Sequence, residues 1–326
     1  MAKQKKRLII IDSNSVIHRA FHALPPLATK KGELLGAVYG FLLVFFKALK
    51  EFQPDYVVAA FDFPALTFRH EKFKGYKAKR PPAPPELYLQ IPKVKEILKA
   101  FDVPVFEKEG FEADDIIATI SKQAPKRQVL PRLETIILSG DLDALQLIDS
   151  QTKVYSLRKG VKDTLLYDEN LVREKYQGLC PEQMNDFKAL KGDPSDNVPG
   201  VTGVGEKTAT ELILKFKNLE SLYKEIEENS EKAKTISPKT KEVLLKYKEQ
   251  AFLSKDLVQL NRSAPIDFDL KKCRWEKYDK AKVVKILGKF EFYSLIPRLP
   301  QPKLPEQKEE EEIKEEEKPP KTRTLF

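Results

Sequence analysis

Short, strongly apolar runs alternate with segments of helical periodicity along the first half of the chain. The runs at 7–12, 56–62 and 135–141 are rich in β-branched residues, and each ends in an aspartate. This alternation predicts an α/β fold with a central, parallel-rich sheet flanked by helices. Because ligands of open parallel sheets bind beyond the carboxyl ends of the strands, Asp12, Asp62 and Asp141 are expected at one edge. Capping of the following helix is the alternative role for each aspartate taken alone.

Two segments depart from this rhythm. Residues 63–85 read as an insertion in the core, with six basic residues between Arg69 and Arg80 and only Glu71 opposing them. After about residue 176 the pattern becomes helical, and the tail from Gln301 is too charged to bury the apolar surface that ordering requires. The sequence therefore predicts an α/β core at 1–176, a helical part at 177–300 and a disordered tail at 301–326.

Composition narrows the class of protein. The net charge is +9, and it rises to +11 without the acidic last 26 residues, which favours a polyanionic partner. No apolar stretch approaches the roughly 20 residues needed to cross a bilayer. Cys180 and Cys273 lie far apart and outside any metal-binding spacing, so a disulfide framework and a zinc site are both disfavoured. A reducing, intracellular compartment is expected.

Nine carboxylates stand at predicted strand ends, helix starts and turns. They are Asp12, Asp62, Glu112, Asp114, Asp115, Asp141, Asp143, Asp193 and Asp196. Gathering them is costly without cations, because neighbouring carboxylates resist joint ionisation. Oxygen ligands without His or Cys select Mg²⁺ or Mn²⁺, and two such ions support in-line hydrolysis of a phosphodiester. The alternative is that these acids are helix caps and surface charges.

The sequence EADD opens a predicted helix. Glu112 and Asp115 then share one face, while Asp114 lies about 100° around the helix from Asp115.

The basic segment and a glycine-rich turn supply candidate DNA contacts. The cations of residues 69–80 are interleaved with Phe68, Phe73 and Tyr76, a combination that grips phosphates and stacks on single-stranded bases. A solvated basic helix is the alternative. In the turn, Glu206 separates Gly205 from Lys207, so a phosphate-binding P-loop is excluded. The turn instead predicts a helix-hairpin-helix that approaches phosphates through backbone amides, with a merely structural turn as the alternative.

Five segments together resemble the flap endonuclease and 5′-3′ exonuclease family, in particular the N-terminal nuclease domain of bacterial DNA polymerase I. They are IIIDSNSVIHRAFHAL, AAFDFPALTFRHEKFKGYKAKRPP, GFEADDIIATI, SGDLDALQL and GDPSDNVPGVTGVGEKTA. The resemblance spans roughly residues 6 to 295. It implies a PIN-like or resolvase-like nuclease core and a helix-hairpin-helix subdomain.

The resemblance also implies residue roles. Asp12, Asp62, Glu112 and Asp114 would surround a first metal, and Asp115, Asp141, Asp143, Asp193 and Asp196 would serve a second. Catalytic roles fall to Lys77, Arg80 and Asp115. DNA contacts fall to Arg19, Arg69, Lys72, Lys74, Tyr76, Gly203, Gly205, Lys207 and Thr208. A K⁺ ion would bind the backbone carbonyls of Val198, Val201 and Val204.

The function so implied is a structure-selective 5′ nuclease, both 5′-3′ exonuclease and 5′-flap endonuclease, in primer processing and DNA repair. Its substrates would be 5′ flaps, branched or nicked duplexes and RNA-primed 5′ ends. A bacterial cytoplasmic monomer near the nucleoid is expected. Leu325 and Phe326 loosely resemble a sliding-clamp-binding end, and nothing after residue 300 resembles a polymerase, so the chain is a stand-alone nuclease or a fragment. A non-catalytic DNA-binding module and a PIN-like ribonuclease are the alternatives.

Overall fold

The computed structural model describes residues 5–126 and 133–302. Most of the predicted disordered tail, with Leu325 and Phe326, lies outside these residues. Six strands form one sheet in the order β3-β2-β1-β4-β5-β6. Their bounds are β1 (Lys6–Asp12), β2 (Tyr56–Ala60), β3 (Val105–Phe106), β4 (Leu133–Ser139), β5 (Thr152–Leu157) and β6 (Thr164–Tyr167). Neighbours run parallel except β6, which is antiparallel to β5, so the predicted parallel-rich α/β fold is confirmed.

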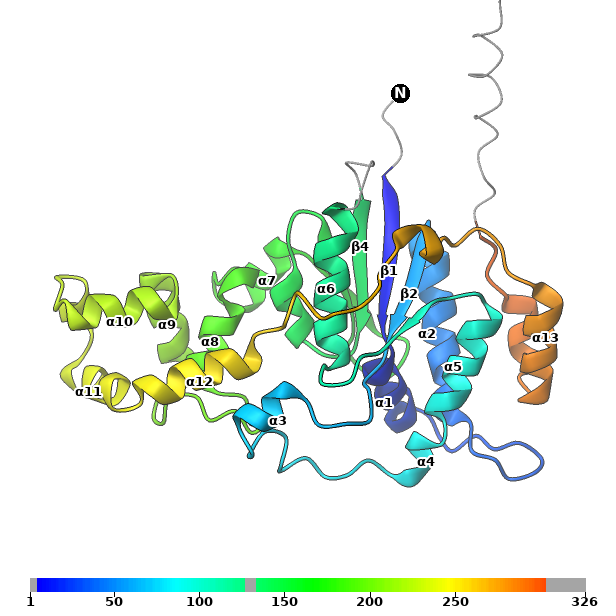
Figure 1. The fold of residues 1–326 in the computed structure, drawn as a ribbon, viewed down its shortest axis with the longest axis horizontal. Coiled ribbons are helices and arrows are strands. Elements are labelled where there is room, and N and C mark those ends of the chain that lie inside the picture. The colour runs from blue at the N-terminus through cyan, green and yellow to red at the C-terminus, as the bar shows by residue number, and fades with distance from the viewer. Residues whose placement is uncertain (1–4, 127–132, 303–326) are drawn as a thin grey trace, which may run out of the picture.

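The sheet is buried on both faces because its central strands carry continuous apolar runs, at 8–11 in β1, 56–60 in β2 and 136–138 in β4. In β1, Leu8 and Ile10 face one hydrophobic core, and Ile9 and Ile11 face the other. Helix α6 (Ala113–Lys126) covers the first face. Helices α1 (Ser13–Ala23), α2 (Gly36–Phe52) and α5 (Ile91–Ala100) cover the second (Figure 1).

The helical part extends from the α6 side of the sheet (Figure 1). Helix α7 (Glu169–Lys175) leads into it from β6, and it comprises α8 (Met184–Lys191), α9 (Glu206–Phe216), α10 (Leu219–Glu227), α11 (Pro238–Lys246) and α12 (Lys248–Val258). Its apolar residues Phe187, Ile213 and Tyr223 belong to the same continuous core as the α6 face of the sheet. The segment 192–205, which contains the turn predicted as a hairpin, joins α8 to α9.

The end of the described chain returns to the α/β core. After the short helix η4 (Leu270–Cys273), the Trp275 N–H donates to the Asp55 carbonyl at 2.8 Å. Helix α13 (Lys280–Lys289) then packs beside α5, and its Val283 and Leu287 join the core of α2 and α5. Within the predicted helical part, 177–300, this last apolar segment thus packs on the opposite face of the sheet from α8 and α9.

The basic segment leaves the sheet after β2 and returns at α5. It contains α3 (Phe68–Lys72), an irregular stretch and α4 (Pro85–Tyr88), and it runs along the lower edge of Figure 1. Tyr76 packs with Val198, Leu257 and Val258 in a small third core, so this segment is fastened to the helical part. Within the described residues, no helix is both long and apolar enough to cross a membrane.

Candidate active site

A cavity of about 520 Å³ opens at the carboxyl edge of the sheet, where the strand order reverses between β1 and β4. Eight of the nine predicted acidic residues line it: Asp12, Asp62, Glu112, Asp114, Asp141, Asp143, Asp193 and Asp196. The strands and the N-terminus of α6 bring the first members together, and the turn after α8 brings the last two. Carboxylates separated by up to about half the chain length thus share one hollow.

Asp12 performs both roles that its position allows. It caps α1 by accepting a hydrogen bond from the Ser15 N–H at 3.2 Å, and it accepts another from the Ser139 hydroxyl at 2.5 Å. Burial raises its pKa to about 7, and the nearby Asp141 and Asp62 carboxylates add to this rise against the Ser139 bond. Near neutral pH this carboxyl can therefore lose its proton to solvent and take a cation in its place.

Asp114, like Asp12, is buried beside other carboxylates, but no hydrogen bond compensates its Oδ1 atom. Its Oδ1 atom is buried and has no hydrogen-bond partner. Burial, and then the Asp12, Asp141 and Asp143 carboxylates, raise its pKa well above the ordinary value. An unpartnered buried carboxylate oxygen beside further carboxylates needs a cation or a proton.

Asp115 points away from the cavity, so its predicted roles as metal ligand and catalytic residue are corrected. Its carboxylate is fully buried and accepts two hydrogen bonds from Arg69, at 2.7 and 2.8 Å. It also accepts from the backbone N–H groups of Asn261 at 2.7 Å and Glu112 at 3.1 Å. All of its lone-pair directions are used, which leaves none for a metal.

Arg69 is likewise corrected from a DNA contact to a structural residue. Its Nε donates to the Leu257 carbonyl at 2.8 Å, and one terminal nitrogen donates to the Gln259 carbonyl at 3.0 Å. The side chain is 1% exposed. Arg69 and Asp115 together join α3, α6 and the end of α12.

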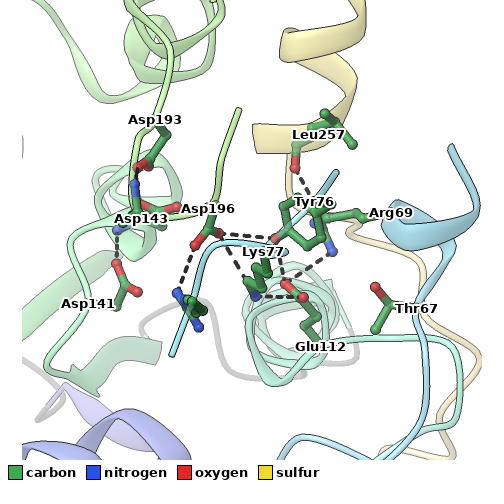
Figure 2. Close-up of polar contacts among 12 residues, drawn as sticks. Thr67, Arg69, Tyr76, Lys77, Glu112, Asp141, Asp143, Asp193, Asp196 and Leu257 are labelled. Carbon is green, nitrogen blue, oxygen red and sulfur yellow. Dashed lines mark hydrogen bonds and ion pairs between the residues drawn. The ribbon is translucent and has the colours of Figure 1, made fainter. Parts of the chain in front are cut away.

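Tyr76 and Lys77 lie between two carboxylates of the cavity (Figure 2). The Tyr76 hydroxyl is 3.1 Å from both Glu112 and Asp196, and Lys77 Nζ is 2.6 Å from Glu112. Arg80 reaches Asp196 at 2.7 Å. Lys77 and Arg80 thus contact the acidic cluster. Tyr76 is only 4% exposed, so its ring is unavailable for stacking on a base. Burial and the Glu112 carboxylate raise the pKa of Tyr76, so its hydroxyl stays a donor.

Lys188 on α8 is a functional candidate that the sequence reading missed. Its ammonium bridges Asp143 and Asp193, the latter at 2.7 Å. Burial raises the pKa of Asp143 to about 6 although Lys188 opposes this. At Asp193 burial also acts to raise the pKa, but Lys188 and the hydrogen bonds from Ser195 together lower it to about 2. Its position five residues before Asp193, on the helix that leads into the acidic turn, is the signal that could have found it.

The donors suit a hard divalent cation in type and charge. The unpartnered Asp114 oxygen, with Asp12, Asp141 and Asp143 as its electrostatic neighbours, offers carboxylate oxygens without His or Cys. In the described parts of the chain, no three acidic, histidine or cysteine side chains already form a ligand cluster. Lys77, Arg80 and Lys188 hold four of the carboxylates in ion pairs, so binding requires these side chains to turn.

The hairpin between α8 and α9 is held by a close backbone approach. A Cβ added to Gly200, whose φ is +62°, would lie 2.3 Å from the Gly192 nitrogen. Beyond it, Gly203 and Gly205 have no atom within 4 Å of an added Cβ, and Lys207 is exposed beside them. No side chain caps the start of α9, which leaves its first N–H groups available to a phosphate, and Thr208 is half-buried in the same turn.

The remaining predicted DNA and K⁺ contacts differ in how exposed they are and in which partners they already have. Lys74 is exposed, and exposed Lys72 pairs with Asp256 at 2.9 Å. Arg19 donates to the Gly140 carbonyl at 3.1 Å on the cavity wall. Two of the three carbonyls predicted to bind K⁺ already accept a hydrogen bond. The Asp193 N–H donates to the Val198 carbonyl, and the Val204 N–H donates to the Val201 carbonyl.

Two family models match consecutive parts of the chain. The first is 5′-3′ exonuclease, N-terminal resolvase-like domain, over residues 7–177, and the second is 5′-3′ exonuclease, C-terminal SAM fold, over 179–281. The sequence is 42% identical over 296 residues to DNA polymerase I of Bacillus subtilis (strain 168). It is 36% identical over 299 residues to DNA polymerase I of Mycobacterium tuberculosis (strain CDC 1551 / Oshkosh). Each alignment covers 91% of this chain and 32% of the relative, so the chain spans about a third of their length.

Solved structures share the fold. The T5 D15 protein co-crystallized with metal ions superposes with a TM-score of 0.63 at 20% identity, covering 90% of this chain and 100% of that one. The catalytic core of Rad2 in complex with DNA substrate superposes with a TM-score of 0.55 at 19% identity, covering 91% and 93%. The resemblance inferred from the motifs is confirmed by the family models.

Proposed function

Because this chain belongs to the 5′-3′ exonuclease family, we propose that it is a metal-dependent 5′ nuclease that hydrolyses DNA phosphodiesters at 5′ flaps and nicks. The observation that carries the proposal is the gathering of eight carboxylates in one cavity around the unpartnered, buried Asp114 oxygen. A protein that only binds DNA gains nothing from such a cluster, since it repels phosphate.

The residues that would hold divalent cations are Asp12, Asp62, Glu112 and Asp114 on one side and Asp141, Asp143, Asp193 and Asp196 on the other. Two Mg²⁺ or Mn²⁺ ions would activate water and stabilise the leaving oxygen. That the T5 D15 protein was crystallized with metal ions supports metal use in this fold. Asp115 is left out of the set because Arg69 and backbone amides saturate it.

Lys77 and Arg80 are the cations that would stabilise the reacting phosphate. Both lie in the cavity wall and already contact carboxylates there, so they can exchange these partners for phosphate oxygens. Burial opposes the charge on Lys77, but the Glu112 and Asp196 carboxylates raise its pKa, which keeps the ammonium protonated at neutral pH. Lys77 also has a φ of +55°, and its N–H donates to the Asp196 carbonyl at 2.9 Å, so its backbone is fixed.

The two parts of the molecule divide the work in this proposal. The α/β core, 1–176, supplies most of the carboxylates that would hold metal, and the helical part adds Asp193 and Asp196. The helical part also grips duplex DNA through the hairpin glycines, Lys207 and Thr208. A K⁺ ion at the carbonyls of Val198, Val201 and Val204 would strengthen that grip. Lys72 and Lys74 on the basic segment would hold the single strand. The DNA complex of the Rad2 core supports DNA as the ligand of this fold.

Cleavage of a labelled 5′-flap duplex tests the function. We expect cutting with Mg²⁺, none with chelator, and loss of at least about 100-fold in rate for Asp114→Asn and Asp141→Asn. The matched control is Asp267→Asn, which removes an exposed carboxylate outside the cavity. Intact wild type that leaves the flap uncut overturns the proposal, and single-stranded RNA cut as fast as the flap favours the ribonuclease alternative.

The remaining expectations on partners and location stay predictions. A bacterial cytoplasmic monomer associated with the nucleoid, acting also on RNA-primed ends, follows from the resemblance. Contact between a sliding clamp and Leu325 and Phe326 concerns residues outside the described part of the chain. Equal clamp binding with and without residues 321–326 would refute that contact.

A further inference from the structure

A second cavity, of about 470 Å³, adjoins the acidic one at the same edge of the sheet. It lies at the carboxyl end of β5, one strand beyond the acidic cavity, and β6 and α7 close its far side. Arg19 and Gly140 line both cavities, so they form a shared wall. A chain molecule can therefore occupy both hollows at once.

The two cavities differ in chemistry. The second one has a floor of leucines, among them Leu142, Leu165 and Leu171, and a rim with Arg158 and Lys175. Its acidic residue is Glu174, so with Arg19 the balance is positive, opposite to that of the acidic cavity. Lys175 Nζ is held 3.1 Å from the Tyr167 hydroxyl and 5.1 Å from the centre of that ring. An apolar floor beside these cations fits a ligand with a flat apolar part and an anionic part.

We infer that the second cavity holds a nucleotide next to the reacting phosphate, with its base on the leucine floor and its phosphate between Arg19, Arg158 and Lys175. This inference rests on the proposed function, because that function places a DNA strand in the adjoining cavity. A nucleotide is the unit of such a strand that matches both the apolar floor and the basic rim. None of the predicted DNA contacts except Arg19 lies in this cavity.

Binding in chelator tests the site without any cleavage. Fluorescence anisotropy of a labelled 5′-flap DNA is compared for Arg158→Ala, Lys175→Ala and the control Lys159→Ala. Lys159 is an exposed cation in the same β5–β6 turn that does not line the cavity. We expect Kd to rise about three- to tenfold for the two cavity variants, with the salt slope falling by about 1, and to rise less than about twofold for the control. Equal effects of all three substitutions would overturn the inference.

The contact between the base and the leucine floor is tested by combining a variant that fills the cavity with DNA that lacks one base. Leu171→Trp fills the space above the floor, and its folding is checked by circular dichroism and thermal unfolding. Abasic sites are placed singly on the 5′ and the 3′ side of the cut. We expect one of them to raise the wild-type Kd by about threefold or more and to leave the Kd of Leu171→Trp unchanged. If neither abasic site weakens wild-type binding, or if the penalties are additive, the site does not hold a base.

These outcomes separate the two proposals. A wild type that leaves the flap uncut but shows the coupling between abasic site and Leu171→Trp would refute the nuclease function and retain the binding site. Flap cleavage without coupling would do the reverse.

Discussion

Replacing Asp12 with asparagine is expected to stabilise the metal-free protein at alkaline pH, although the aspartate is buried and hydrogen-bonded. Its pKa is raised from 3.8 to about 7 by burial and by the Asp141 and Asp62 carboxylates. At pH values well below 3.8 the carboxyl is protonated in both the folded and the unfolded state. As pH rises toward 7, the unfolded state loses the proton first, so the folded state becomes progressively less favourable.

The magnitude follows from the shift. A rise of about three pKa units corresponds to about 4 kcal/mol of lost stability between pH 4 and pH 8. Asparagine does not titrate and keeps an acceptor for the Ser15 N–H, but its amide group fits the Ser139 hydroxyl less well, at a cost of about 1 to 2 kcal/mol. The expected net gain for Asp12→Asn is therefore about 2 kcal/mol at pH 8, with a loss of about 1 kcal/mol at pH 4.

Urea unfolding in chelator at pH 4 and pH 8 measures both values. The exposed control Asp267→Asn should show no such change of sign. Adding Mg²⁺ at pH 8 should stabilise the wild type and should stabilise Asp12→Asn much less, because binding of the ion removes the charge cost that asparagine has already removed. If Asp12→Asn lowers the free energy of unfolding at pH 8 as much as at pH 4, ionisation of Asp12 does not destabilise the folded protein, contrary to this prediction.

Three further predictions concern the groups around the cavity. Lys77→Ala should lower kcat much more than DNA affinity, whereas Lys72→Ala should mainly raise Kd and lower the salt slope by about 1; parallel losses in both variants would undo that division. Asp115→Asn should lower the free energy of unfolding by about 3 kcal/mol, because buried Arg69 loses its two-bonded carboxylate and keeps only Glu112, 3.5 Å away. The double change Asp115→Leu with Arg69→Met should cost less than either of these two changes alone, and urea unfolding decides this. Gly205→Ala, whose methyl meets no atom within 4 Å, should leave thermal unfolding unchanged and weaken duplex binding, and unaltered Kd would show that the backbone there does not approach DNA.

The strand-end acids were predictable because a parallel sheet brings strand ends together whatever else the chain does. Asp12, Asp62 and Asp141 needed only the recognition of three apolar runs, and all three line the cavity. The alternative of capping and the functional reading were not exclusive, since Asp12 caps α1 while it lines the cavity.

The roles of Asp114 and Asp115 could not be separated from sequence. Helical geometry places them about 100° apart but does not say which one faces the cavity. Asp115 accepts hydrogen bonds from Arg69, which is 46 positions away in sequence. Arg69 lies on the segment whose basic composition indicated DNA binding. Tyr76 was misread for the same reason. Its burial comes from Val198 and Leu257, which only the folded chain brings against it.

Basic side chains of the same molecule neutralise part of the negative charge in the acidic cavity. For this reason the acidic residues indicated a metal site from sequence, but the sequence did not show which basic residues pair with them. Lys77 and Arg80 arrive from the basic segment, Lys188 arrives from α8, and each neutralises a carboxylate supplied by a different element. In the absence of metal these ion pairs tie the basic segment and the helical part to the sheet edge. A cation that takes over Asp143 or Glu112 would free Lys188 or Lys77, and a phosphate is the group in the proposed reaction that can accept the freed ammonium. Metal and DNA are therefore expected to bind cooperatively. The metal replaces a lysine as the partner of a carboxylate, and the DNA phosphate then becomes the partner of that lysine.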